Sequence, residues 1–361
     1  MNPENPNRQY YPALDGLRGL AILLVVVYHN FGFIDYFFFG WLGVDLFFVL
    51  SGFLITDILL KTVQRKDFLK NFYIRRALRI FPLYYFCLVL FLFVAPVLSN
   101  HFTVKYYTDN QVFLWTYLQN WLFIFKEAGQ TTGLHHLWSL AVEEQFYLIW
   151  PLVILAFKKP KVLFAFITII LLLVIAFRLW IWIYDVTNLA YFNLYTFSRI
   201  DGLCIGCLVA LLQKIDKNFL KKYTFFIVLF FAIANLVFFF INRSSNFSFP
   251  YLALIGYTTF AMMFGLLVNE AVTKETKIIN VLFTITPLRF LGKISYGLYI
   301  FHWPLYLILS PYLSDLLPEL GDDSYTNILS SIIITLTGIF ISWLSYHYFE
   351  KRFLDLKNKF I

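Results

Sequence analysis

The chain has 361 residues, of which 60% are apolar and only 14% are charged, and its mean hydropathy is +0.71. Soluble domains carry roughly a quarter charged residues and at most about half apolar residues, so this composition excludes a water-soluble fold. The net charge of +8 is better explained by basic cytoplasmic loops of a membrane protein than by nucleic-acid binding, and we expect no nucleic-acid partner.

Ten segments, taken in chain order, are long and apolar enough to cross a bilayer, which requires about 20 residues. They are 17–34, 40–60, 81–98, 136–157, 162–184, 190–212, 222–241, 250–269, 292–310 and 327–349. The expected fold is an all-α polytopic bundle of about ten transmembrane helices, with the lipid bilayer as its first partner. No repeat or linker divides the chain, so residues 1–361 are expected to form a single membrane domain.

The stretch 111–125 is also apolar, but it is short and contains several amide side chains. If it crossed the membrane, every basic loop from Lys158 onward would lie outside, against the positive-inside rule. We therefore expect residues 99–133 to form an outer loop with an amphipathic or re-entrant piece, and both termini to be cytoplasmic.

Charged groups within spanning helices are costly, so each of them marks a candidate functional site. In the first helix, Arg18 and His29 are eleven residues apart, which places them on one face and roughly 16 Å apart along the axis. A snorkelling arginine and a core histidine bonded to a backbone carbonyl form an equally good structural explanation of this pair.

The second helix contains Asp45 and Ser51 among glycines that allow close helix approach. Ser51 is either a site residue or a serine bonded to its own helix. The loop that follows ends in Arg75, Arg76 and Arg79, whose guanidinium groups match phosphate geometry. These arginines either hold the phosphates of a nucleotide-bearing donor or anchor the chain to lipid head groups.

In the fourth helix, His136, Ser139 and Glu143 follow helical spacing and share one face. Glu143 and Glu144 lie past the first turn, within the apolar run, so simple capping of the helix dipole does not explain them. We favour a functional role for Glu143 and a structural one for Glu144.

The later helices contribute a second set of candidates. Asp201 lies too close to Arg199 in sequence to pair with it along one helix face, so a partner from another helix is expected, with Arg178 as the candidate. His302 is either a supporting site residue or a packing hydrogen bonder. Cys204 and Cys207 have no second cysteine pair or nearby histidine, so we expect no metal site.

Taken together, six of these segments resemble the acyltransferase-3 family of integral membrane acyltransferases. The matching stretches are ALDGLRGLAILLVVVYH, GWLGVDLFFVLSGFLI, FYIRRALRIFP, HLWSLAVEEQFYLIWP, SRIDGLCIG and ISYGLYIFHWP. They occur in the family's order and cover nearly the whole chain, and YFEKRF resembles the family's end. Each motif is weak alone, but six in order are a specific signal.

The resemblance implies a membrane O-acyltransferase that moves an acyl group, most often acetyl, from cytoplasmic acyl-CoA to a hydroxyl of an extracytoplasmic glycan or envelope molecule. Acyl-CoA would be a co-substrate, with no permanently bound cofactor, and the bacterial inner membrane would be the location. The family's paired arginine and histidine match Arg18 and His29, with His29 catalytic, and its glutamate matches Glu143. Its donor-associated arginines match Arg76 and Arg79, and the chain would be a stand-alone member without an esterase-like domain.

A hydroxyl attacks a thioester efficiently when a base removes its proton. We expect His29 to be that base, with Glu143 or another buried carboxylate orienting its ring. Arg18, Ser51 or His302 would stabilise the oxyanion. Two alternatives stay open, a transporter or flippase for a lipid-linked or glycan substrate and a non-catalytic membrane scaffold, although transporters often show internal repeats and this chain shows none.

Overall fold

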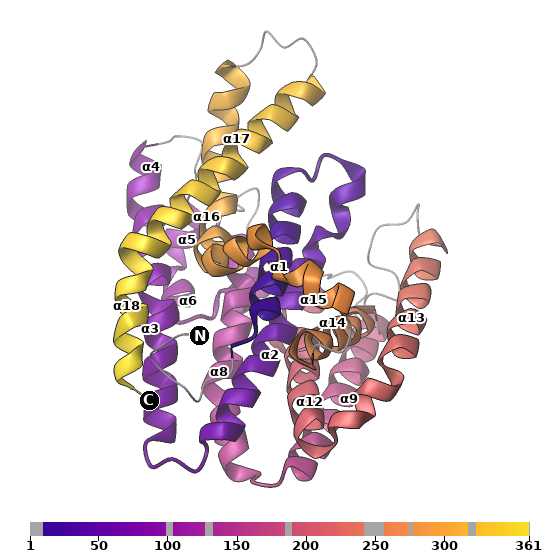
Figure 1. Cartoon of the computed structure of the whole chain (residues 1–361). Helices are drawn as coiled ribbons and strands as arrows, with labels where there is room; N and C mark the ends of the chain where they lie inside the picture. Colours follow the sequence, from indigo (N-terminus) through magenta and orange to yellow (C-terminus); the bar gives the residue numbers. More distant parts are fainter. Residues whose placement is uncertain are drawn as a thin grey trace.

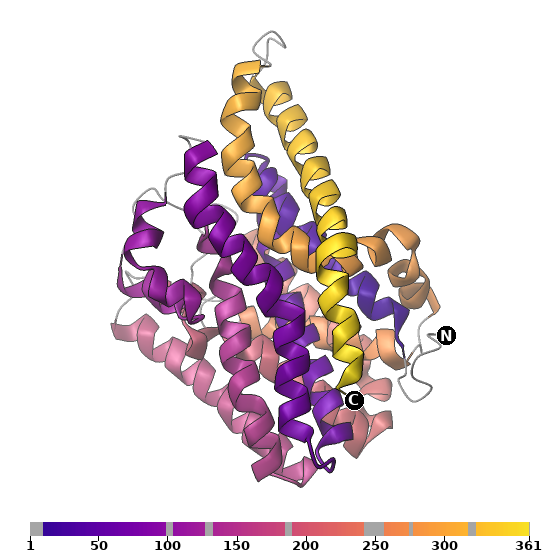
Figure 2. The ribbon, with the colours of Figure 1, turned by 90° about the vertical axis from the view of Figure 1, so that its left-hand side faces the viewer.

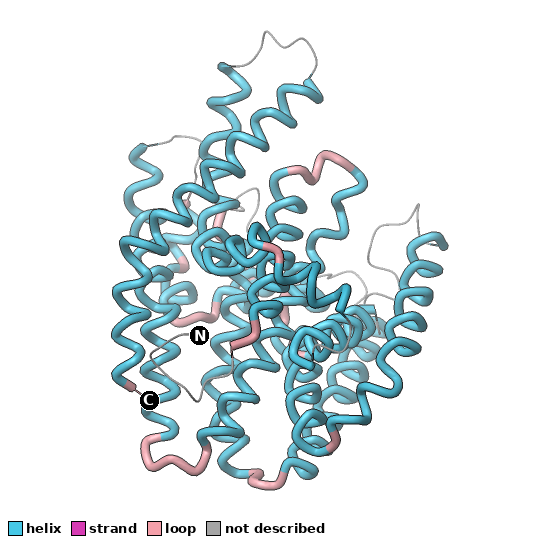
Figure 3. The backbone as a smooth tube through the Cα atoms, in the orientation of Figure 1, coloured by secondary structure: helices cyan, strands magenta, loops and turns pink. Residues whose placement is uncertain are grey.

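The computed structural model describes residues 10–98, 104–126, 133–184, 190–241, 256–273, 277–316 and 323–360. These ranges are almost entirely helical and contain no strand (Figure 3). Within them, six helices are long and apolar enough to cross a membrane: Pro12–Asn30, Asp35–Thr62, Phe68–Val97, His135–Ala156, Pro160–Tyr184 and Tyr325–Leu356. The expected all-helical membrane fold is confirmed at this level, while the count of about ten spans and the cytoplasmic termini stay predictions.

Helix α1 (Pro12–Asn30) runs through the centre of the molecule and is flanked by α2 (Leu42–Thr62) and α16 (Thr286–Leu316) (Figure 1). The backbones of α1 and α16 nearly touch, because a Cβ atom added at Gly292 would lie 1.8 Å from the carbonyl oxygen of Asp15. Small residues thus set the close approach of these helices, as in other membrane bundles. The short helix η1 (Asp35–Trp41) joins α1 to α2.

Helix α3 (Phe68–Val89) continues through a π-turn (Leu90–Val94) into α4 (Ala95–Leu98). The sequence predicted that the basic segment up to Arg79 is a loop. The structure shows instead that this segment forms the first turns of a long helix. Phe72 and Ile80 are buried on one side of these turns. This buried apolar side explains why the turns are helical although they contain several charged residues. Helix α8 (Trp138–Ala156), preceded by the short helix η3 (His135–Leu137), packs nearby.

The segment between α4 and α8 forms three short helices, α5 (Lys105–Asp109), α6 (Gln111–Trp115) and α7 (Gln119–Phe125). None of them is long enough to span, which agrees with the expected non-spanning segment. The part of this prediction that falls on residues 99–103 and 127–132 lies outside the described residues.

The expected continuous span over 190–212 is wrong. After α9 (Pro160–Tyr184), the chain forms α10 (Ala190–Asn193), α11 (Thr196–Arg199) and α12 (Asp201–Ile215). The breaks are stabilised by polar side chains, because Ser198 donates to the Tyr191 carbonyl oxygen and Asn120 donates to the Leu194 carbonyl oxygen.

Three further helices follow α12 in the chain. They are α13 (Lys217–Ile241), α14 (Tyr257–Thr273) and α15 (Lys277–Thr284). Residues 250–255 of the expected span 250–269 lie outside the described residues. Helices α16 and α17 (Asp323–Leu344) form an antiparallel pair that projects beyond the rest of the bundle (Figures 1 and 2). The chain then passes through a π-helical turn (Ser345–Glu350), α18 (Lys351–Leu356) and a short 3-10 helix (Lys357–Lys359), with α18 beside α3.

Candidate active site

A cavity of about 410 Å³ lies where α1 ends and α8 begins. Its lining residues come from the last turn of α1 and the loop after it, from η3 and from the middle of α16. They are Tyr28, His29, Gly32, His135, His136 and Trp303. His302 lies directly behind this lining and is 1% exposed. The fold thus brings together three histidines that the sequence placed on three different helices, His29, His136 and His302.

The hydrogen bonds of His29 identify which of its ring nitrogens is free. Its Nδ1 atom lies 3.0 Å from the Val25 carbonyl oxygen and 3.3 Å from Nε2 of His302. A carbonyl oxygen only accepts hydrogen bonds, so Nδ1 carries the proton in the neutral ring. The lone pair is therefore on Nε2, the nitrogen that a ligand in the cavity can reach. The hydrogen bond to a backbone carbonyl oxygen that is expected for a structural histidine is present, but the His29 ring also lines the cavity.

His302 is held in the complementary tautomer. Its Nδ1 atom lies 2.7 Å from the Tyr299 carbonyl oxygen, to which it must donate, so its Nε2 atom carries a lone pair. This lone pair accepts from Nδ1–H of His29. The group that orients the His29 ring is thus another histidine together with a backbone carbonyl.

Glu143 does not reach His29, so the expectation that this carboxylate orients the ring is corrected. Its Oε1 atom accepts from Ser51 Oγ at 2.8 Å, and its Oε2 atom accepts from the Tyr147 hydroxyl at 3.0 Å. Ser51 therefore bonds across helices and not to its own. The reason for the error is distance along the chain, because Glu143 lies on α8 about two helical turns beyond His136, which is on η3.

His136 is anchored from two sides. Its Nε2 atom lies 3.3 Å from the Ile300 carbonyl oxygen, and its own carbonyl oxygen accepts from the Tyr299 hydroxyl at 2.6 Å. Because the Tyr299 proton is used in that bond, Ser139 donates to the Tyr299 oxygen, also at 2.6 Å. His136 is 4% exposed, and among the described residues its Nδ1 atom has no hydrogen-bond partner.

The arginines lie toward the opposite end of α1. Arg76 stacks on the Tyr147 ring, with its guanidinium carbon 3.7 Å from the ring centroid. Arg18 and Arg79 lie close enough to Arg76 to interact electrostatically with it. Arg75 instead donates to the Phe360 carbonyl oxygen at 2.9 Å, so it ties the end of the described chain to α3. Three of the four expected arginines thus form one cluster.

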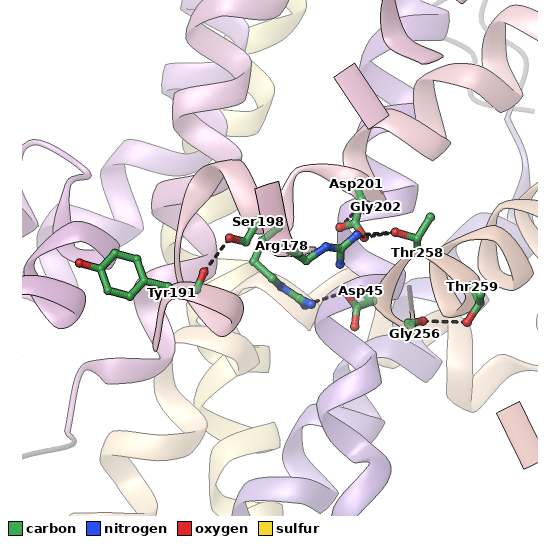
Figure 4. A network of polar contacts seen from close by, with 10 residues as sticks. Asp45, Arg178, Tyr191, Ser198, Asp201, Gly202, Gly256, Thr258 and Thr259 are labelled. Atoms are coloured by element: carbon green, nitrogen blue, oxygen red, sulfur yellow. Dashed lines mark hydrogen bonds and ion pairs between the residues drawn. The ribbon is translucent and has the colours of Figure 1, made fainter. Parts of the chain in front are cut away.

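Asp45 and Asp201 belong to a separate buried network (Figure 4). Asp201 forms an ion pair with Arg178 at 3.1 Å, which confirms the expected partner from another helix. Asp45 forms an ion pair with Arg199 at 2.6 Å, which the sequence did not indicate. None of these four side chains lines the cavity. They join α2, α9, α11, and α12, so this network supports the helices and does not touch the site.

The segment that was expected to form an outer loop supports the cavity wall. The Phe123 ring of α7 stacks on the His135 ring with centroids 4.7 Å apart, and the Tyr107 hydroxyl accepts from the Leu134 N–H at 3.1 Å. Burial raises the pKa of Tyr106 to about 12, so its hydroxyl stays protonated and donates to the Lys126 carbonyl oxygen. This segment therefore fixes the position of η3, whose residues His135 and His136 line the cavity.

Sequence reasoning missed four residues of the lining, Tyr28, Gly32, His135 and Trp303. All of these except Gly32 directly neighbour a histidine that was singled out, which is the signal that could have found them. The Trp303 ring lies 5.0 Å from the His29 ring and is stacked on Tyr306. Within the part of the chain that the structure describes, no group of three or more histidine, cysteine or acidic side chains is arranged to hold a metal ion.

Comparison with known proteins places these features in a family context. The family model described as an acyltransferase domain matches residues 11–347. The chain is 31% identical over 373 residues to the peptidoglycan O-acetyltransferase OatA of Listeria monocytogenes, an alignment that covers 98% of this chain and 57% of that protein. It is 31% identical over 375 residues to the putative peptidoglycan O-acetyltransferase YrhL of Bacillus subtilis, covering 97% and 56%.

A putative O-acetyltransferase of Staphylococcus aureus strain COL is 32% identical over 333 residues, covering 85% of this chain and 52% of that protein. The chain thus spans about half the length of these curated relatives. No solved structure matches it.

Proposed function

Because the chain belongs to the acyltransferase family, which its residues 11–347 match, we propose that it is a membrane O-acyltransferase. It transfers an acetyl group from acyl-CoA to a hydroxyl of an envelope glycan, the substrate type named in its relatives. The observation that carries this proposal is the tautomer of His29, whose unprotonated Nε2 atom is left available to a cavity at one end of the bundle.

His29 acts as the general base. The acceptor hydroxyl donates to Nε2, and the base takes this proton as the oxygen attacks the thioester carbonyl carbon. The tetrahedral intermediate then collapses, the C–S bond breaks, and the proton passes from Nε2 to the departing CoA thiolate. The products are the O-acetyl ester and free CoA, so one proton moves from oxygen to sulfur without any co-reactant.

His302 is a positioning residue in this scheme. While His29 is neutral, His302 selects the tautomer by accepting from Nδ1–H. While His29 is positively charged, the same hydrogen bond becomes charge-assisted and is roughly twice as strong. This is the role that a carboxylate plays in a serine hydrolase triad.

The donor binds from the arginine end of α1. Arg76 and Arg79, with Arg18, supply positive charge for the CoA phosphates. From Arg76, a path of contacting polar side chains runs through Tyr147 and Glu143 to Ser51. The extended arm of CoA would follow this path and present its acyl group near His29, roughly 16 Å from Arg18 along α1.

We infer the location of the protein from the positions proposed for the donor and the acceptor. The arginine end faces the cytoplasm, where acyl-CoA is found, and the cavity faces the outside of a bacterial inner membrane. Basic residues on the cytoplasmic side agree with the general charge rule of membrane proteins.

The test compares the full chain purified in detergent with His29→Ala and with His347→Ala, an exposed histidine outside the cavity lining. Acetyl-CoA binding and acceptor-dependent CoA release are measured together. We expect all three proteins to bind acetyl-CoA, and only the wild type and His347→Ala to release CoA with a glycan. A folded wild type that binds no acyl-CoA would refute the donor site and favour a transporter.

A further inference from the structure

The proposed reaction creates a negative charge that needs a hydrogen-bond donor. When the acceptor oxygen attacks the thioester, an electron pair of the C=O bond moves onto the carbonyl oxygen, and an oxyanion forms. The sequence left Arg18, Ser51 and His302 open as its partners. Arg18 lies roughly 16 Å from His29 along α1. The Ser51 hydroxyl already donates to a carboxylate, and both ring nitrogens of His302 are already in hydrogen bonds.

His135 is a second histidine whose ring borders the cavity and has no role in the scheme so far. Its side chain is half-buried and belongs to the cavity lining, so a molecule in the cavity can reach it. In the described part of the chain, neither of its ring nitrogens has a hydrogen-bond partner. The rings of His135 and His29 are close enough to interact electrostatically. A reacting group in the cavity can therefore contact both of them.

The His135 ring is held in place by contacts that leave its nitrogens free. It stacks on the Phe123 ring, with centroids 4.7 Å apart and planes within 25°. The short helix η3 is anchored at its end, because the fully buried Gln119 donates to the Leu137 carbonyl oxygen at 2.8 Å. A donor that is positioned before the reaction needs no reorganisation when the charge develops.

The protonation of His135 suits it to donate a hydrogen bond. None of the six lining residues is acidic, so no counter-charge in the cavity favours an imidazolium. A neutral imidazole has one N–H group and one lone pair. Because no protein group selects its tautomer, either nitrogen can present the N–H to a ligand. His29, in contrast, presents a lone pair, so the two rings offer complementary groups.

We propose that His135 is a further catalytic residue, which stabilises the oxyanion of the tetrahedral intermediate by donating its N–H to it. This inference rests on the proposed function. As the acceptor oxygen forms its bond to the carbonyl carbon, His29 takes the acceptor proton, and the former carbonyl oxygen accepts from His135. When the intermediate collapses, the C=O bond is restored and the C–S bond breaks. His135 keeps its proton throughout, so the balance of the reaction is unchanged.

The contribution of His135 should appear in kcat and not in donor binding. A thioester carbonyl oxygen is neutral, whereas the oxyanion makes a charge-assisted hydrogen bond that is roughly twice as strong. Only an interaction that is stronger in the transition state than in the ground state accelerates the chemical step. Removing one donor to an oxyanion lowers kcat by about a hundredfold to a thousandfold in well-studied hydrolases.

The first test uses His135→Phe, which keeps a ring against Phe123 but removes the N–H, and His135→Gln, which keeps an N–H donor. His347→Phe, at an exposed position, is the matched control. We measure kcat for CoA release, the Kd for acetyl-CoA and the Tm in detergent. We expect His135→Phe to lower kcat about a hundredfold with an unchanged Kd and Tm. His135→Gln should recover part of the rate.

The second test compares two unreactive donor analogues, S-acetonyl-CoA and S-trifluoroacetonyl-CoA. The trifluoromethyl ketone adds a hydroxyl group and forms a tetrahedral adduct, whereas the methyl ketone stays planar. The wild type should bind the trifluoro analogue at least about a hundredfold more tightly, as transition-state analogues do. In His135→Phe this ratio should fall at least about tenfold. A merely structural role of His135 would leave the ratio of the two Kd values unchanged.

The outcomes separate the two proposals. A wild type that releases no CoA with any acceptor overturns the acyltransferase function, and the role of His135 with it. An active wild type whose kcat and analogue ratio are shared by His135→Phe overturns the role of His135 alone. The Tyr28 hydroxyl is the other side-chain donor to test at this lining. If Tyr28→Phe loses the ratio while His135→Phe keeps it, the oxyanion is bound by Tyr28 and the proposal is refuted.

Discussion

Replacing His302 tests the central geometric claim about the site. The substitution His302→Leu removes the Nε2 lone pair that lies 3.3 Å from Nδ1 of His29 while it keeps a bulky apolar side chain in the bundle. A hydrogen bond to a charged group contributes about 1.5–3 kcal/mol. Because this bond is charge-assisted only while His29 holds the proton, its loss should fall on kcat.

The Val25 carbonyl oxygen remains as a second acceptor at 3.0 Å, so the loss should be near the lower limit. About 1.5 kcal/mol corresponds to a decrease of roughly tenfold in kcat. His302→Asn retains an oxygen that can accept, and it should recover part of this rate. The Kd for acetyl-CoA should be unaffected in both variants, since the arginines lie at the other end of α1.

The assay is the initial rate of CoA release at saturating acetyl-CoA and glycan, with thermal unfolding in detergent recorded for each variant. His347→Leu, at an exposed position, serves as the matched control. If His302→Leu is folded and has the kcat of the wild type, His302 only packs against His29. The proposed orienting role would then be refuted.

Further predictions concern the donor path, the helix contacts, the buried charges and pH. Glu143→Gln removes the carboxylate that accepts from two hydroxyls, and we expect about a tenfold weaker Kd for acetyl-CoA; an unchanged Kd would exclude Glu143 from the donor path. Gly292→Ala places a Cβ atom 1.8 Å from a backbone oxygen and should lower stability by about 1–3 kcal/mol in thermal unfolding, whereas Gly338→Ala, with its nearest contact at 3.4 Å, should be neutral. Asp45→Asn leaves the buried Arg199 without its charge partner and should cost about 3–5 kcal/mol, seen as a lower Tm or failure to fold; a Tm equal to that of the wild type would contradict the buried ion pair. Since the base must be unprotonated, kcat/KM for the glycan should rise with pH to a plateau, and a profile that falls over the same range would contradict a neutral His29.

Sequence reasoning correctly placed one pair of residues on a single helix and predicted one contact between helices. Arg18 and His29 lie on one helix at the predicted spacing, and Asp201 pairs with Arg178 as expected. These inferences depend on the helical repeat and on the cost of an unpaired charge in a membrane, both of which act locally. The break in the expected span 190–212 was missed, because polar side chains from other helices stabilise it.

The sequence by itself determined that this chain is a helical membrane protein with polar groups at a few defined depths, because hydropathy and charge are summed along a single segment. Only the tertiary structure decided which of these groups meet. It paired His29 with His302 across 273 positions and Ser51 with Glu143 across 92. Contacts of this kind depend on which faces of α1, α2, α8 and α16 turn toward one another, and that choice is made by close packing of the whole bundle.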